Sequence, residues 1–77
     1  MKIIRQIDVF DKSTEVLVDE IVLDSFNLEK FKMSFKIKSN DLDMFDPYEI
    51  TELTKDLFLN INFDFNKFYY YLACYQE

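Results

Sequence analysis

The chain of 77 residues contains no glycine and a single proline, Pro47. Glycine is the usual residue where a turn needs a left-handed backbone, so the turns of this chain must be built from Asn, Asp, Ser and Lys. Glycine-rich phosphate loops and the dinucleotide-binding fingerprint are excluded, because both need a backbone that can approach a phosphate closely. The sequence therefore contains no glycine-based nucleotide-binding motif on which a function could depend.

Aromatic side chains must supply much of the core. The chain has nine Phe and five Tyr, and each aromatic side chain can bury roughly 150–250 Å². A chain of this length lies near the lower limit for folding without disulfides or metals. The aromatic bulk offsets the small size and argues against disorder, since disordered chains have few aromatics. We predict one domain that spans residues 1–77.

The N-terminal third reads as a β-hairpin. Residues 2–10 alternate between two faces, the turn chemistry of Asp and Ser occupies residues 11–14, and residues 15–23 are rich in β-branched side chains. Residues 67–76 form a further predicted strand. Its two faces carry Phe68, Tyr70, Leu72 and Cys74 on one side and Tyr69, Tyr71, Ala73 and Tyr75 on the other. Apolar residues on both faces suggest a strand that is central in its sheet or covered on both sides.

Two short helices are predicted between these strands. Residues 25–37 are ambiguous, because the apolar residues from Phe31 to Ile37 alternate with polar ones as in a strand. Leu28, Phe31 and Phe35 also share a helical stripe, and Asp24 and Ser25 offer cap chemistry, which favours a short helix over residues 26–35. Residues 39–48 read as a loop. Helical spacing then links apolar residues from Ile50 to Ile61, with Thr51 as the predicted N-cap. The predicted fold class is α+β: a small, mostly antiparallel sheet in the order β-β-α-α-β, with two short helices on one face.

Residue types that usually carry catalysis are scarce. Histidine does not occur, and the lone cysteine, Cys74, lies in a predicted strand as a small core residue. Glu52 and Asp56 share a helical face, but nothing near them suggests a nucleophile or a pocket. We predict that the chain is not an enzyme and needs no cofactor.

One segment resembles the start of a calcium loop. Asp41 and Asp43 take the first and third positions and Glu52 the twelfth. The fifth and sixth positions, however, hold Phe45 and Asp46 where a calcium loop needs a ligand and glycine. We predict no metal site.

The net charge of −6 is concentrated in residues 39–66. Negative charge in one place can steer a basic partner, and tyrosine is favoured at protein interfaces. A solvated surface that keeps the chain soluble is the plainer interpretation. The predicted partner contacts are Asp41, Asp43, Asp46, Tyr48, Glu49, Glu52 and Asp56. For Tyr69, Tyr71 and Tyr75, an interface and a sheet face packed on a helix stay open.

Nucleic acid and membrane are not expected partners. The four lysines in residues 30–38 are too few for a strong phosphate footprint in an acidic chain. No apolar stretch is long enough to cross a membrane, and Arg5, Gln6 and Asp8 interrupt the N-terminal apolar run. A single cysteine fits a reducing compartment. We predict a cytoplasmic protein.

Three stretches, residues 10–18, 43–51 and 63–68, resemble a family of small bacterial domains that are similar to the immunity proteins of polymorphic-toxin systems, including contact-dependent growth inhibition. The resemblance implies a cytoplasmic inhibitor that binds one cognate toxin domain. Such toxins are often nucleases with basic substrate sites, which an acidic surface would match. The resemblance also favours a helix at residues 26–35.

The function hypothesis is therefore an acidic immunity protein that binds and neutralises a toxin domain. Two alternatives remain. One is an inhibitor from a mobile element that mimics nucleic acid. The other is a structural module that self-associates through an exposed strand edge.

Overall fold

The computed structural model describes residues 2–76 and contains a four-stranded sheet, one α-helix and one 3-10 helix. The elements are β1 (Ile3–Asp11), β2 (Leu17–Val22), α1 (Leu28–Ser34), β3 (Tyr48–Ile50), the 3-10 helix η1 (Lys55–Leu57) and β4 (Phe68–Gln76). The α+β class and the antiparallel sheet are confirmed. The order of elements differs from the prediction, because β3 lies between α1 and η1.

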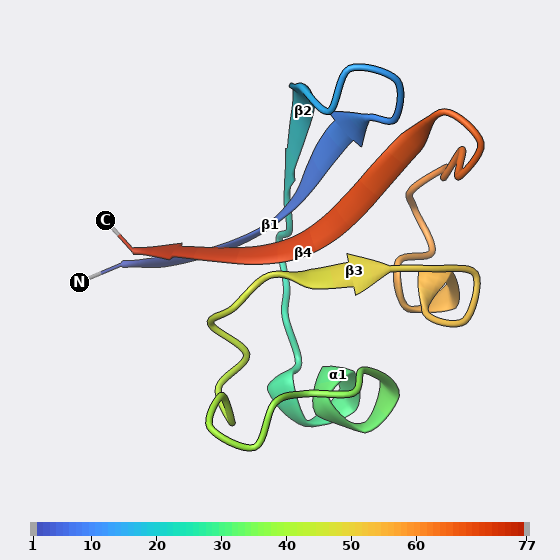
Figure 1. Cartoon of the computed structure of the whole chain (residues 1–77). Helices are drawn as coiled ribbons and strands as arrows, with labels where there is room; N and C mark the ends of the chain where they lie inside the picture. Colours follow the sequence, from blue (N-terminus) through green and yellow to red (C-terminus); the bar gives the residue numbers. More distant parts are fainter. Residues whose placement is uncertain (1, 77) are drawn as a thin grey trace.

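The sheet has the strand order β2-β1-β4-β3, and every neighbouring pair is antiparallel. The long strands β1 and β4 run side by side in the middle and curve together (Figure 1). The predicted N-terminal hairpin and the C-terminal strand are therefore confirmed. β4 is central in its sheet, as its two apolar faces indicated.

The hydrophobic core lies on one face of this sheet. It joins Ile7 of β1 and Leu72 of β4 to aromatic rings from the segments that cover them, among them Phe31 of α1 and Phe58. The rings of Phe31 and Phe58 stack with centroids 5.4 Å apart. The helix α1 and the segment that contains the 3-10 helix η1 thus share one face of the sheet.

The helix predicted at residues 26–35 is present as α1. Phe31 and Phe35 are buried while Met33 is exposed, so the helical period describes this segment and strand alternation does not. The cap is Asn27, whose Oδ1 accepts a hydrogen bond from the Lys30 amide at 3.1 Å. The prediction of Asp24 or Ser25 as the cap was wrong.

The second predicted helix was wrong. Its apolar residues divide: Ile50 is 1% exposed in β3, whereas Leu53 is 93% exposed. β3 pairs with β4 and satisfies backbone groups along that edge of β4, so tertiary pairing overrides the helical spacing. Thr51 and Thr54 instead close a tight turn, in which the Leu53 amide donates to Thr51 Oγ1 at 3.2 Å. Only η1 remains helical.

The turns show how the chain manages without glycine. Glu15 and Met44 both have positive φ, at 61° and 55°, a region that costs a non-glycine residue roughly 1–2 kcal/mol. At the first turn, Asp11 Oδ1 accepts hydrogen bonds from the Ser13 amide at 2.8 Å and the Thr14 amide at 3.1 Å. Side-chain hydrogen bonds thus stabilise a strained turn.

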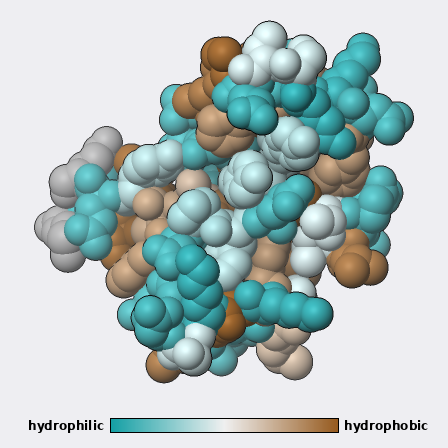
Figure 2. All heavy atoms as spheres, in the orientation of Figure 1, coloured by the Kyte–Doolittle hydropathy of each residue, from teal (hydrophilic) through white to brown (hydrophobic). Residues whose placement is uncertain are grey.

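The surface carries apolar side chains in separate places. In the view of Figure 2, hydrophobic atoms emerge between hydrophilic ones rather than as one continuous area. Exposed residues of this kind include Met33, Leu53 and Leu59. Among residues 2–76, no helix has the length and apolar character needed to cross a bilayer.

Candidate protein-binding face

The face of the sheet opposite the core carries a row of acidic residues. Strand pairing sets Glu20 of β2 beside Asp8 of β1, Asp8 beside Tyr71 of β4, and Tyr71 beside Glu49 of β3. Paired residues of an antiparallel sheet point to the same side, and neighbouring strands lie about 4.8 Å apart. One row across all four strands therefore holds three carboxylates and a phenol. We call this side of the sheet the acidic face.

Asp8 is the buried centre of this face. It is 5% exposed, and its two oxygens accept hydrogen bonds from Gln6 Nε2 at 2.7 Å and from the Tyr75 hydroxyl at 2.6 Å. Gln6 Nε2 also donates to Glu20 Oε2 at 2.6 Å. Neutral donors thus hold both acids in place while leaving their negative charge uncompensated.

The acids of this row form no ion pair with a cation in residues 2–76. The two ion pairs found in residues 2–76 join Lys38 to Asp46 and Lys55 to Glu52, so neither uses an acid of the row. Lys12 lies at one end of the face, with its Nζ 5.1 Å from the centre of the Tyr69 ring. The charge of the row is therefore not neutralised by an ion pair within residues 2–76.

A groove runs beside Asp8 on this face. Ala73 lies between Tyr71 and Tyr75 on the same side of β4, and its small side chain leaves a hollow between two large ones. The cavity has a volume of about 340 Å³ and is lined mainly by apolar and aromatic side chains, with Phe45 and Pro47 at its rim and Asp8 at its wall.

Both tyrosines of the groove keep their protons to high pH. The hydrogen bond to Asp8, followed by burial, raises the pKa of Tyr75 to about 12. Burial, and after it the negative charge of Glu49, raises the pKa of Tyr71 above its usual value. Each phenol is therefore a hydrogen-bond donor at neutral pH.

The Tyr75–Asp8 hydrogen bond should appear in the pH dependence of stability. An unfolded tyrosine releases its proton near pH 10, and Tyr75 in the folded chain does so near 12. The hydrogen bond of Tyr75 thus contributes fully to the free energy of unfolding below about pH 10, and this contribution is lost as the pH rises to about 12. We expect Tyr75→Phe to lose less stability over this range than wild type, measured as the urea midpoint.

Tyr69→Phe is the matched control, because no hydrogen bond of the Tyr69 hydroxyl occurs in residues 2–76. It should follow the wild-type pH dependence. If Tyr75→Phe and wild type lost the same stability between about pH 10 and pH 12, the role given to the Tyr75–Asp8 hydrogen bond would be contradicted.

Comparison with known proteins places the chain in a family. The family model described as a domain of unknown function, DUF7683, matches residues 4–73. The chain belongs to this family. The matched range contains the whole acidic row and ends before Tyr75. No curated protein matches the chain, and no solved structure does.

Two of the residues predicted as partner contacts lie inside the molecule. Asp41 and Tyr48 are buried, and the Tyr48 hydroxyl donates to Asp41 Oδ2 at 2.7 Å. Asp41 also accepts from the amides of Phe45 at 2.8 Å and Asp46 at 2.9 Å. These two side chains shape the loop before β3 and do not form part of the free surface.

The other predicted contacts divide between two regions. Glu49 lies in the acidic row. Asp46 is half-buried and Glu52 is exposed, and each forms a local ion pair. Asp43 and Asp56 are exposed and form none among the described residues. The structure therefore does not bring the predicted set together on one surface.

Sequence reasoning missed Asp8, Glu20 and Gln6. A turn confined to residues 11–14 would set Phe10 opposite Glu15, whereas the structure pairs Phe10 with Leu17 and has an irregularity between Val9 and Phe10. The polar positions of residues 2–10 that fall between the apolar ones were the available signal. Their neighbours could not be read without the register.

Cys74 differs from its prediction. It is half-buried and lines the groove, and it is not a member of the core cluster. Tyr69, Tyr71 and Tyr75 lie on the acidic face and not on the core side, so they are not packed under a helix.

Asp41 should be important for stability. Burial alone would raise its pKa, but hydrogen bonds from Tyr48 and from the amides of Asp46 and Phe45 outweigh burial and hold the pKa of Asp41 below its usual value. The Asp41 carboxylate therefore stabilises the fold at pH values above the pKa of an unfolded aspartate. This stabilisation is lost as the pH falls through the lower pKa that Asp41 has in the folded chain. We expect Asp41→Ala to lower the free energy of unfolding by about 2–3 kcal/mol at neutral pH, because three donors lose their acceptor.

Urea unfolding at about pH 7 and pH 3 measures this effect. Asp43→Ala is the control, because Asp43 is exposed and uses only its backbone carbonyl, which accepts from Arg5 at 2.8 Å. Equal losses for the two variants would contradict the structural role of Asp41.

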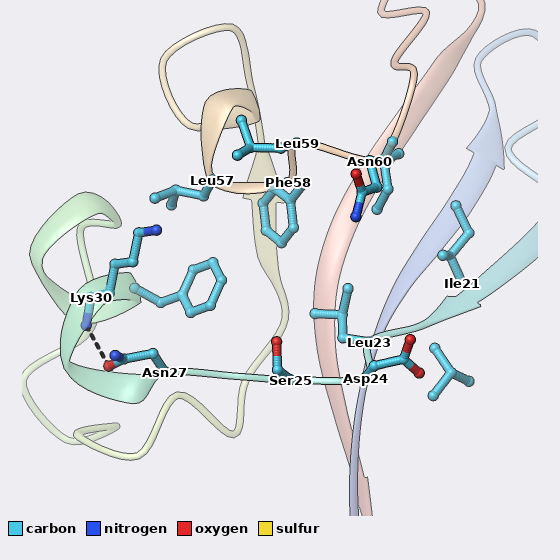
Figure 3. A pocket seen from close by; sticks show the side chains of 13 residues that line it. Ile21, Leu23, Asp24, Ser25, Asn27, Lys30, Leu57, Phe58, Leu59 and Asn60 are labelled. Carbon is cyan, nitrogen blue, oxygen red and sulfur yellow. Dashed lines mark hydrogen bonds between the residues drawn. The ribbon is translucent and has the colours of Figure 1, made fainter.

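A second hollow lies on the core side, between the end of β2, the start of α1 and residues 57–61 (Figure 3). Its volume is about 390 Å³. Ile21 and Leu23 lie on one side and Phe58 faces them from the other (Figure 3). These side chains pack against or belong to the core cluster. We interpret this hollow as a gap where the segments over the core do not fully cover it beside the edge strand β2.

Proposed function

We propose that this chain is an immunity protein that binds and neutralises a basic toxin domain through its acidic face. The observation that carries the proposal is the row of Glu20, Asp8 and Glu49 on a sheet face without helices, in which no acid is paired with a cation of residues 2–76. The chain would act by binding and would contribute no reactive group of its own.

The composition of the face supports a protein partner. Tyrosines offer rigid area and hydrogen-bond donors, which are typical of protein interfaces. The carboxylates repel the phosphates of nucleic acids and of anionic lipid surfaces. A nuclease toxin has a basic substrate site, where carboxylates can take the positions of phosphates. The resemblance to immunity proteins in residues 10–18, 43–51 and 63–68 supports the same class of partner.

Co-expression tests the proposal directly. The chain would be expressed with the toxin domain encoded immediately upstream of its gene, and both would be purified together. We expect cells to survive only when the chain is present, and a stable complex to be recovered. If no neighbouring gene encodes a toxin, or if the toxin is neither bound nor neutralised, the proposal fails.

Self-association is the second candidate, and the edge strand β2 favours it. β2 pairs only with β1, and Val18 and Val22 are exposed. Two copies paired antiparallel about the middle of β2, however, would set Asp19 opposite Glu20 of the other copy, and like charges in that position destabilise a pair. Size-exclusion chromatography with light scattering tests self-association, because a chain that stays monomeric at high concentration eliminates this candidate.

A further inference from the structure

We infer that the groove between Tyr71 and Tyr75 receives an arginine side chain of the protein partner. This inference rests on the proposed function in one respect, that the partner is a basic protein. It adds the chemistry of the central contact and the place on the acidic face where that contact is made.

The shape of the groove suits a long, flat side chain. Ala73 is 5% exposed and forms the floor, and Tyr71 and Tyr75 line the groove with it, the Tyr75 hydroxyl reaching Asp8 at 2.6 Å. Pro47 and Phe45 add apolar surface at the rim. The methylene groups of an arginine can lie on such a surface while its guanidinium reaches the polar end.

The charge of the groove selects a cation. Asp8 lines the groove, is 95% buried and receives hydrogen bonds only from the neutral groups of Gln6 and Tyr75 among the described residues. Glu49 lies beside Tyr71 in the same row. A cation that enters the groove therefore meets uncompensated negative charge in a place shielded from solvent, where the attraction is stronger than in bulk water.

Arginine fits these walls better than lysine. Its guanidinium is planar, more weakly hydrated than an ammonium group, and stacks on aromatic faces. The chain already uses this arrangement beside the groove, where the Arg5 guanidinium lies 4.3 Å from the centre of the Phe26 ring and 5.5 Å from that of the rim residue Phe45. The groove offers two tyrosine rings and a carboxylate for the same kind of contact.

Titration of the purified chain with N-acetyl-arginine methylamide tests the inference without the natural partner. Backbone amide shifts in NMR spectra would be followed, and we expect saturable changes at Tyr71, Ala73, Cys74 and Tyr75. N-acetyl-citrulline methylamide has nearly the same shape without the charge, and we expect it to bind about tenfold more weakly or not at all. Equal binding of the two compounds, or shifts confined to other residues, would overturn the inference.

Two variants locate the site. Ala73→Leu fills the groove and should abolish saturable binding, and Asp8→Asn keeps the shape while removing the charge, so it should weaken arginine binding to the citrulline level. If Ala73→Leu fails to fold, Asp8→Asn alone decides. Wild-type affinity in a folded variant of either kind would overturn the inference.

The outcomes separate this inference from the proposed function. A chain that neutralises its toxin but does not bind the arginine probe keeps the function and loses the inference. A chain that binds the probe in the groove but neutralises no toxin loses the function and keeps the groove as an arginine site.

Discussion

If the proposed function holds, replacing both Glu20 and Glu49 with lysine will slow association of the chain with the proposed toxin partner by about 10- to 100-fold at low salt. These two acids occupy the outer positions of the acidic row, on either side of Asp8 and Tyr71. Complementary charge mainly accelerates encounter, so the association rate should fall more than the dissociation rate rises. Stopped-flow or surface-based kinetics over a range of salt concentrations measures this effect. The difference from wild type should shrink with salt, because exposed charges are screened.

The double substitution Asp43→Lys with Asp56→Lys is the matched control. Each double variant changes the net charge from −6 to −2, and both Asp43 and Asp56 are exposed acids outside the row. We expect this control to slow association much less. A larger effect from the control would place the interface in the acidic segment of residues 39–66, as the sequence alone predicted, and would contradict the assignment to the sheet face.

Substitution of Leu72 by alanine will remove a large part of the stability of the fold. Leu72 is 2% exposed on the central strand β4, opposite Ile7 of β1 and Tyr48 of β3. A buried Leu→Ala change costs about 3–5 kcal/mol when the site cannot collapse, and a domain of this length has a total stability of roughly 4–12 kcal/mol. Urea unfolding should show a much lower midpoint, or a chain already partly unfolded without urea.

Leu53→Ala is the control with the same chemical change at an exposed position. Leu53 is 93% exposed in the turn after β3. The free energy of unfolding of the Leu53→Ala variant should therefore differ from that of wild type by less than about 0.5 kcal/mol. The predicted helix over residues 50–61 would have buried Leu53 beside Ile50. A loss at Leu53 comparable with the loss at Leu72 would therefore support that helix and contradict the strand β3.

Local chemistry was enough for the outer elements. Alternation in residues 2–10 and 67–76 and β-branched residues in 15–23 predicted three strands that the structure has. The segment of α1 was ambiguous, since its apolar residues fit both periods, and the burial of Phe31 and Phe35 without Met33 decided it. The spacing of apolar residues predicts a strand or helix correctly where the geometry of that element alone decides which side chains are buried.

Residues 48–61 show where local patterns fail. Ile50 and Leu53 carry the same helical signal, yet one is buried in a strand and the other lies in solvent. The edge of β4 is made by residues that are far away in the sequence, and pairing with it satisfies backbone groups. A window of neighbouring residues contains no information about that edge.

The amino-acid sequence alone determined the α+β class, the hairpin, the C-terminal strand and the acidity, because these depend on spacing and composition within short segments. The tertiary structure decided which acids lie together. Asp41 and Tyr48 turned inward to support a loop, while Glu20, Asp8 and Glu49 came from three strands to one row. The physical reason is register: a shift of one residue moves a side chain to the opposite face of a sheet, and only pairing between distant strands sets that register.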